Sequence, residues 1–94
     1  MIRLQRGDYD MTVDSRRKQS FLRAYLLKEI YDFHFLHSGF AKGISTHLKD
    51  EEIKLALLYL AEKNFIELIN LDNPVFSEAK ITSYGIDEVE SQMQ

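Results

Sequence analysis

Two histidines in the first half of the chain have the spacing of a metal-binding pair. His34 and His37 are three positions apart, which places both rings on one face of a helix, where a histidine pair can bind zinc. The remaining ligands would have to come from an irregular turn around His47, and phenylalanines flank the pair. Histidine that stabilises the C-terminal end of a helix is the simpler interpretation. We therefore predict no metal site.

A run of three carboxylates, Asp50-Glu51-Glu52, is a second candidate, for acid–base chemistry or a divalent cation. Consecutive helical residues point about 100° apart, so these side chains diverge. Negative charge at the start of a helix, where the backbone dipole favours it, explains the run without chemistry. The four glycines are scattered, cysteine is absent, and no set of serine, histidine and aspartate can be assembled. The sequence predicts neither an enzyme nor a cofactor.

Basic side chains are distributed unevenly along the 94 residues. Residues 1–28 carry seven basic and three acidic side chains, whereas residues 29–94 carry five basic and twelve acidic ones, for a formal net charge of -3. The N-terminal part is thus the better place for a phosphate backbone, and a solvated surface is the alternative interpretation. The candidate DNA contacts are Arg16, Arg17, Lys18, Lys42, Ser45, Thr46, His47, Lys49, Lys54, Asn73 and Lys80.

The N-terminal third is predicted to combine an arm and a helix. Residues 1–14 are expected to form a polar arm with at most one short strand, because Gly7 interrupts regular structure. From about Ser15 to Leu36 the apolar spacing predicts a helix. Its main stripe consists of Leu22, Leu26, Ile30 and Phe33. The opposite side is also apolar, so this helix must be buried on two sides, by its own chain or by a second one.

A helix over about residues 50–63 has the clearest pattern in the chain. Acidic residues begin it, and Asn64 is a suitable left-handed stop after its last turn. Its core side consists of Ile53, Ala56, Leu57 and Leu60. Between residues 39 and 48 the glycines predict turns, and a short helix and an extended stretch both remain open.

Two strands and a last helix are predicted to follow. The strands cover about residues 65–71 and 75–82 and are joined by a hairpin loop, with Pro74 at the first position of the second strand. Val75, Ala79 and Ile81 are expected on one face of that strand. Thr82 is a suitable N-cap for a helix over about residues 83–92.

This order of elements resembles that of a winged helix-turn-helix. The pattern Ile53-x-x-Ala56-Leu57-x-x-Leu60-x-x-Lys63-Asn64-Phe65-Ile66 resembles the third helix and first wing strand of MarR- and PadR-type regulators. The step Ile81-Thr82-x-x-Gly85-Ile86 resembles their passage from the second wing strand into the next helix, and the similarity covers about residues 20–92. The expected fold is α+β, mainly α: a winged helix with a three-helix core, a two-stranded wing hairpin and a C-terminal helix, over residues 15–94.

The resemblance implies a dimeric, DNA-binding transcriptional regulator. In DNA-binding members, the third helix enters the major groove with polar and basic side chains. Here the side opposite its core face carries Glu51, Leu55, Leu58 and Glu62, a poor surface for phosphates. The alternative is a winged-helix protein–protein interaction module without significant DNA affinity, because this fold also serves that purpose.

Apolar side chains outside the core stripes predict an interface. A homodimer is expected whose interface uses the first helix, the last helix or both, with Tyr31 and Phe35 as anchors. On the helix over residues 50–63, Leu55, Leu58 and Tyr59 are expected to be covered by the arm or by another protein. The absence of cysteine, of a signal-peptide core and of an apolar run approaching about 20 residues predicts a cytoplasmic chain without a membrane partner.

Overall fold

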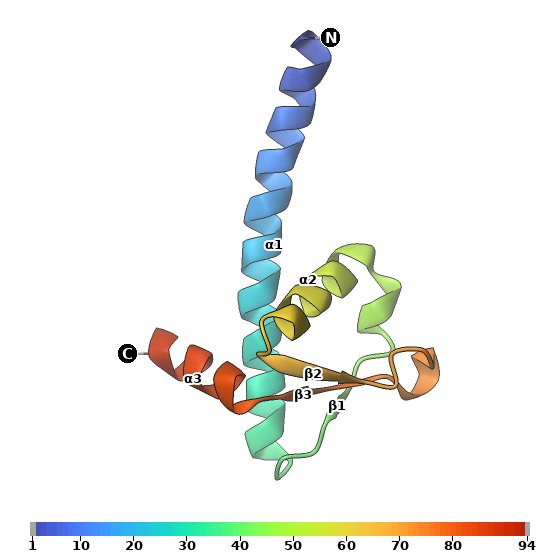
Figure 1. The fold of residues 1–94 in the computed structure, drawn as a ribbon, viewed down its shortest axis with the longest axis vertical. Helices are drawn as coiled ribbons and strands as arrows, with labels where there is room; N and C mark the ends of the chain where they lie inside the picture. Colours follow the sequence, from blue (N-terminus) through green and yellow to red (C-terminus); the bar gives the residue numbers. More distant parts are fainter. Residues whose placement is uncertain (1, 94) are drawn as a thin grey trace.

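The computed structural model describes the backbone of residues 2–93 and the side chains of residues 16–93. Within that part the chain forms an α+β fold that is mainly helical, with three α-helices and a three-stranded antiparallel sheet (Figure 1). In chain order the elements are α1 (Ile2–Leu36), β1 (Lys42–Gly43), the 3-10 helix η1 (His47–Lys49), α2 (Glu51–Glu62), β2 (Ile66–Ile69), the 3-10 helix η2 (Pro74–Phe76), β3 (Glu78–Ile81) and α3 (Ser83–Gln92).

The first helix is longer than the sequence predicts. It begins at Ile2 and not near Ser15, so the backbone of residues 2–14 is helical and the expectation of an arm with a short strand was wrong there. A single glycine costs a helix only about 1 kcal/mol relative to alanine, so Gly7 alone does not end it. Whether the side chains of the predicted arm cover α2 lies outside the described residues.

A short strand before α2 completes the sheet. The strand order is β1-β3-β2, and both pairs are antiparallel. Ile66 of β2 lies opposite Ile81, and Lys42 of β1 lies opposite Ala79. The stretch that the sequence left open, residues 39–48, therefore contains both an extended piece and the beginning of the short helix η1.

The connection between β2 and β3 is longer than expected. Pro74 begins η2 rather than the strand, and Val75 lies outside the sheet with 74% of its surface exposed. Ala79 and Ile81 are buried on one face of β3 as expected, whereas placing Val75 on that face was wrong. Proline has a fixed φ that suits the first turn of a helix and lacks the N–H that a ladder requires.

The core lies between α1, α2 and the sheet. Its buried apolar side chains are Leu26, Leu27 and Ile30 of α1; Ile44; Ala56, Leu57 and Leu60 of α2; Ile66, Ala79 and Ile81 of the sheet; and Val89 of α3. The predicted core sides of both helices are confirmed at their centres. Leu22, Phe33 and Ile53, which belong to the predicted core sides, are only partly buried.

Local signals end α2 and begin α3 where the sequence predicts. Asn64 has a φ of 64°, the left-handed conformation expected after α2. The Thr82 hydroxyl accepts a hydrogen bond from the Gly85 N–H at 3.1 Å, which confirms it as the N-cap of α3. Thr82 also donates from its hydroxyl to the Asn64 carbonyl and from its backbone N–H to the Phe65 carbonyl. Hydrogen bonds therefore hold the start of α3 against the turn that follows α2.

Candidate interaction surface

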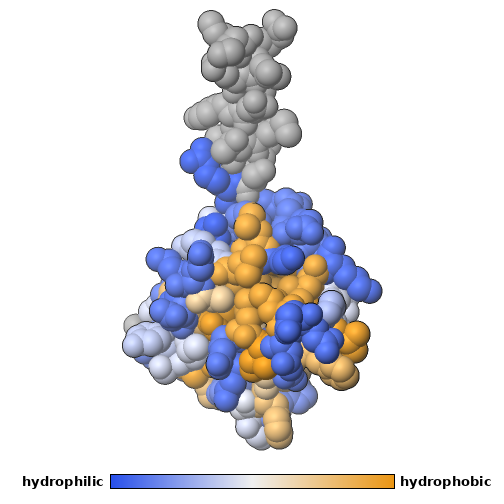
Figure 2. Space-filling model, turned by 45° about the vertical axis from the view of Figure 1, so that its right-hand side comes forward, coloured by the Kyte–Doolittle hydropathy of each residue, from blue (hydrophilic) through white to orange (hydrophobic). Residues whose placement is uncertain are grey.

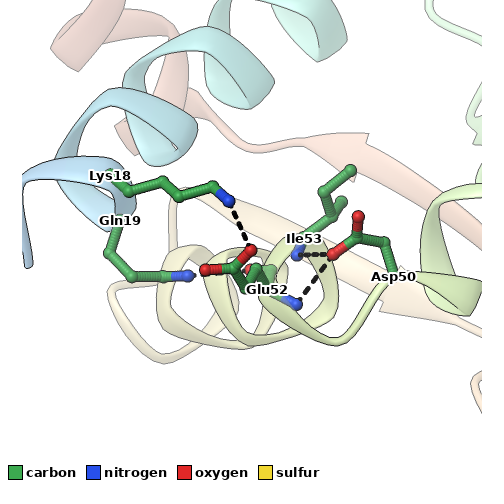
Figure 3. Close-up of polar contacts among 5 residues, drawn as sticks. All are labelled: Lys18, Gln19, Asp50, Glu52 and Ile53. Atoms are coloured by element: carbon green, nitrogen blue, oxygen red, sulfur yellow. Dashed lines mark hydrogen bonds and ion pairs between the residues drawn. The ribbon is translucent and has the colours of Figure 1, made fainter. Parts of the chain in front are cut away.

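The carboxylate run at residues 50–52 is used by the chain itself. Asp50 lies just before α2, and its Oδ1 accepts hydrogen bonds from the N–H groups of Glu52 at 2.9 Å and Ile53 at 3.2 Å (Figure 3). These are two of the N–H groups that the start of a helix leaves without a helical partner. This cap and the negative charge at the helix start account for the run, as the sequence indicates.

One candidate DNA contact is engaged by a carboxylate of the same chain. Lys18 Nζ of α1 lies 2.6 Å from Glu52 Oε1 of α2, and Gln19 Nε2 donates to the Glu52 carbonyl at 2.9 Å (Figure 3). The hydrogen bond and negative charge of Glu52 raise the pKa of Lys18. The charge of Lys18 is therefore directed at α2.

The histidines make contacts within the fold. His47, a candidate DNA contact, lies 3.1 Å through Nε2 from Glu29 Oε1 of α1, and both side chains are partly buried. The ring of His37 stacks on Phe33 with centroids 4.1 Å apart, and the edge of the His34 ring meets Phe35 at 4.9 Å. His47 thus links η1 to α1, while the other two pack on neighbouring aromatic rings.

An apolar surface bordered by acidic side chains covers the outward side of α2. We call Glu51, Leu55, Leu58 and Glu62 the α2 face. Leu55 is 57% exposed. Leu55 and Leu58 line one shallow groove of about 580 Å³ that reaches Arg23 of α1, and a second of about 410 Å³ that reaches Lys54. Figure 2 shows apolar side chains gathered, with hydrophilic ones around them, on the side of the molecule that α2 and the hairpin occupy in Figure 1.

Tyr59, expected to be part of an interface, is covered by a side chain of α1. The Arg23 guanidinium lies 3.6 Å from the centroid of the Tyr59 ring, a distance at which cation and ring attract each other. Tyr59 is partly buried and packs against the core. Of the three interface candidates on α2, Leu55 is the most exposed.

A third depression lies between the hairpin tip and the start of α2. We call it the hairpin groove: its volume is about 420 Å³, and its lining residues are Ser45, Leu48, Lys49, Lys54, Leu71, Pro74 and Val75. The structure thus brings together three of the candidate DNA contacts, Ser45, Lys49 and Lys54. Sequence reasoning missed the apolar lining from the hairpin because it placed Val75 on a strand.

The other candidate contacts do not line this groove. Arg16 and Arg17 are exposed on α1, Lys80 is exposed on β3, and Thr46 is exposed just before η1. Lys42 Nζ lies 5.1 Å from the centroid of the Phe33 ring. The Asn73 backbone carbonyl accepts a hydrogen bond from Ser77 within the hairpin. Of the eleven candidates, three line the hairpin groove.

The predicted dimer anchors differ in exposure. The Tyr31 hydroxyl donates to Glu90 Oε2 of α3 at 3.0 Å, and burial, followed by this hydrogen bond, raises the pKa of Tyr31. Phe35 is 57% exposed, and the centroid of its ring lies 4.9 Å from the centroid of the Tyr31 ring. Further exposed apolar side chains on or near α1 are Phe21, Tyr25, Leu36 and Phe40. The fold thus leaves apolar surface on α1 uncovered, as the two-sided sequence pattern indicates.

Comparison with family models, curated proteins and solved structures gives no significant match for this chain. Among the residues that the structure describes, none of the helices combines the length and hydropathy required to cross a membrane.

Proposed function

We propose that this chain is a winged-helix domain whose α2 face binds another protein. The order helix, short strand, 3-10 turn, helix, hairpin and helix supports the winged-helix assignment, as does the sheet order β1-β3-β2. In such a domain α2 takes the position of the recognition helix, so its outward side chains govern what is bound.

Leu55, which is exposed, and Leu58, which is partly buried, are the observation that carries the proposal. Leu55 and Leu58 form the floor of two adjoining grooves, with Glu51 and Glu62 at their edges. Apolar floors of this kind accept the side chains of a partner helix or loop, because their burial removes hydrocarbon from water. Phosphates, in contrast, are repelled by the carboxylates at both edges.

The hairpin tip supports the same conclusion. We expect the wing of a DNA-binding winged helix to carry basic side chains, because these supply much of the affinity for phosphates. Here residues 70–76 are Asn-Leu-Asp-Asn-Pro-Val-Phe, with one acidic and no basic side chain. Leu71, Val75 and Phe76 are exposed. A tip of this composition suits contact with protein better than contact with a polyanion.

The test compares capture by three forms of the immobilised chain from an extract of the source cell. Leu55→Glu places a charge on the α2 face, and Lys80→Glu is the control, because Lys80 is exposed on β3, outside the α2 face and outside α1. We expect a protein that wild type and control retain and Leu55→Glu loses. Once the captured protein has been purified, its Kd for the Leu55→Glu chain should be about 30-fold higher than for wild type, as expected for a residue at the centre of an interface. Equal retention by all three forms contradicts the proposal.

DNA binding is the second candidate function, because Ser45, Lys49 and Lys54 lie together beside the hairpin. We then expect weak affinity that falls as salt is added, since the groove offers only two cations to phosphates. Fluorescence anisotropy with labelled genomic fragments, from about 50 to 200 mM salt, measures it. Loss of affinity in Lys49→Gln/Lys54→Gln supports this candidate. Tight and salt-insensitive binding contradicts the charge argument, and absence of binding leaves protein recognition as the function.

A further inference from the structure

From the hairpin groove we infer the chemistry of the partner. This groove binds a segment of the partner in which an apolar side chain is flanked by carboxylates. This inference rests on the proposed function and specifies it. The floor is hydrocarbon from Leu48, Leu71 and Val75, while Lys49 and Lys54 supply positive charge at the same opening. A segment that is only apolar leaves the lysines without a partner, and one that is only anionic leaves the hydrocarbon in water.

Both lysines are available to a ligand. Among the described side chains, the ion pairs join Lys18 to Glu52, Lys28 to Asp32 and His47 to Glu29, and neither groove lysine takes part. The net charge of the chain is -3, and the lining of this groove is a local exception because it carries two cations and no carboxylate. Such an exception attracts carboxylates in preference to cations and neutral groups.

The wall that the hairpin contributes is held in place by its own hydrogen bonds. Ser77 is 1% exposed, and its hydroxyl lies 2.9 Å from the Asn70 carbonyl and 2.8 Å from the Asn73 carbonyl. Pro74 fixes the first turn of η2, which sets the position of Val75. Because the wall is built before the ligand arrives, little ordering entropy opposes binding.

The hairpin groove adjoins the grooves of the α2 face at Lys54. Lys54 lines the hairpin groove and also the 410 Å³ groove that contains Leu55 and Leu58. A partner seated on the two leucines therefore extends directly to the hairpin. Its acidic part meets Lys49 and Lys54, which fixes the direction in which it lies along α2.

The experiment titrates the isotope-labelled 94-residue chain with a capped peptide, Glu-Glu-Leu-Leu-Glu-Glu, and follows backbone amides by NMR. We expect saturable shifts at residues 45–54 and 71–76. A peptide with glutamine in place of glutamate should bind about fivefold more weakly. The Lys49→Gln/Lys54→Gln chain should bind the acidic peptide more weakly by the same factor. Lys80→Gln, an exposed lysine on β3, is the matched control and should leave the affinity unchanged.

Several results would overturn the inference. Equal affinity for the glutamate and glutamine peptides removes the role of charge, and absence of shifts removes the site. A DNA duplex that shifts these amides, where the peptide does not, reassigns the lysines to phosphate. The captured protein separates this inference from the proposed function. If Leu55→Glu abolishes binding of that protein and Lys49→Gln/Lys54→Gln does not, the α2 face is a binding site and the inference about the hairpin groove is wrong.

Discussion

Replacing Gly85 with alanine should destabilise the fold, although alanine is the better helix former. Gly85 is buried in the first turn of α3, where the helix meets the backbone at the end of α2. A Cβ at this position would lie 2.1 Å from the Phe65 carbonyl oxygen and 2.7 Å from Ile81 Cγ1. Real Cβ atoms essentially never come within 3.0 Å of such neighbours, so α3 must move away. The same carbonyl accepts the Thr82 N–H at 3.0 Å, so the movement also strains that hydrogen bond.

Two opposing effects set the magnitude. Alanine gains about 1 kcal/mol over glycine inside a helix. Overpacking costs about 3 kcal/mol, the upper part of its usual range, because the obstacle is backbone and not a flexible side chain. The net loss in the free energy of unfolding of Gly85→Ala is therefore about 2 kcal/mol.

Urea denaturation followed by circular dichroism measures this loss. With a slope of about 2 kcal/mol per molar urea, the midpoint should fall by about 1 M. Gly43→Ala is the control: a Cβ there has no atom within 4 Å, so its midpoint should stay within about 0.5 kcal/mol of wild type. A Gly85→Ala chain as stable as wild type would refute the close approach of α3 to the Phe65 carbonyl.

Three further predictions concern the contacts of α1 and α3. Thr82→Ala should cost about 1 kcal/mol in urea denaturation by removing the cap on the Gly85 N–H, whereas Thr82→Ser should retain it; an unchanged midpoint in Thr82→Ala would contradict the cap. In an absorbance titration Tyr31 should ionise above the ordinary tyrosine pKa of 10.0, and Glu90→Gln should lower its pKa only in part because burial is the larger cause. Since the pKa of Tyr31 is raised in the folded state, the stability that it contributes is complete below pH 10.0 and is lost as the pH rises through the folded pKa. If the late ionisation persists in Tyr31→Phe, it belongs to another tyrosine. Light scattering should show a dimer at high micromolar concentration that Phe35→Glu converts to monomer, and a monomeric wild type would end the dimer hypothesis.

The sequence by itself determined the coarse class and the positions of α2 and α3. These helices begin and end through signals that involve neighbouring residues only: acidic residues at the start of α2, a left-handed Asn64 after it, and Thr82 before α3. A cap reaches two or three residues along the chain, so its effect does not depend on the rest of the fold. The core sides of the helices followed from apolar spacing for the same reason.

The sequence misjudged features in which weak local preferences compete with the rest of the structure. A single Gly7 was taken as a break, although its cost is small beside the length of α1. The hairpin was drawn too short because Val75 has a strong strand propensity, while the proline before it begins a 3-10 helix. Propensities of this kind are worth less than about 1 kcal/mol per residue, and tertiary context overrides them.

Only the tertiary structure decided which charged and apolar side chains remain available to a partner. Lys18 and Glu52 are 34 positions apart in the chain, and no sequence pattern predicts that they meet. Lys49, Lys54 and Val75 likewise come together only because the hairpin folds back beside the start of α2. Ion pairs and grooves depend on distances in space between segments remote in sequence, so composition alone supplied the candidates and packing selected among them.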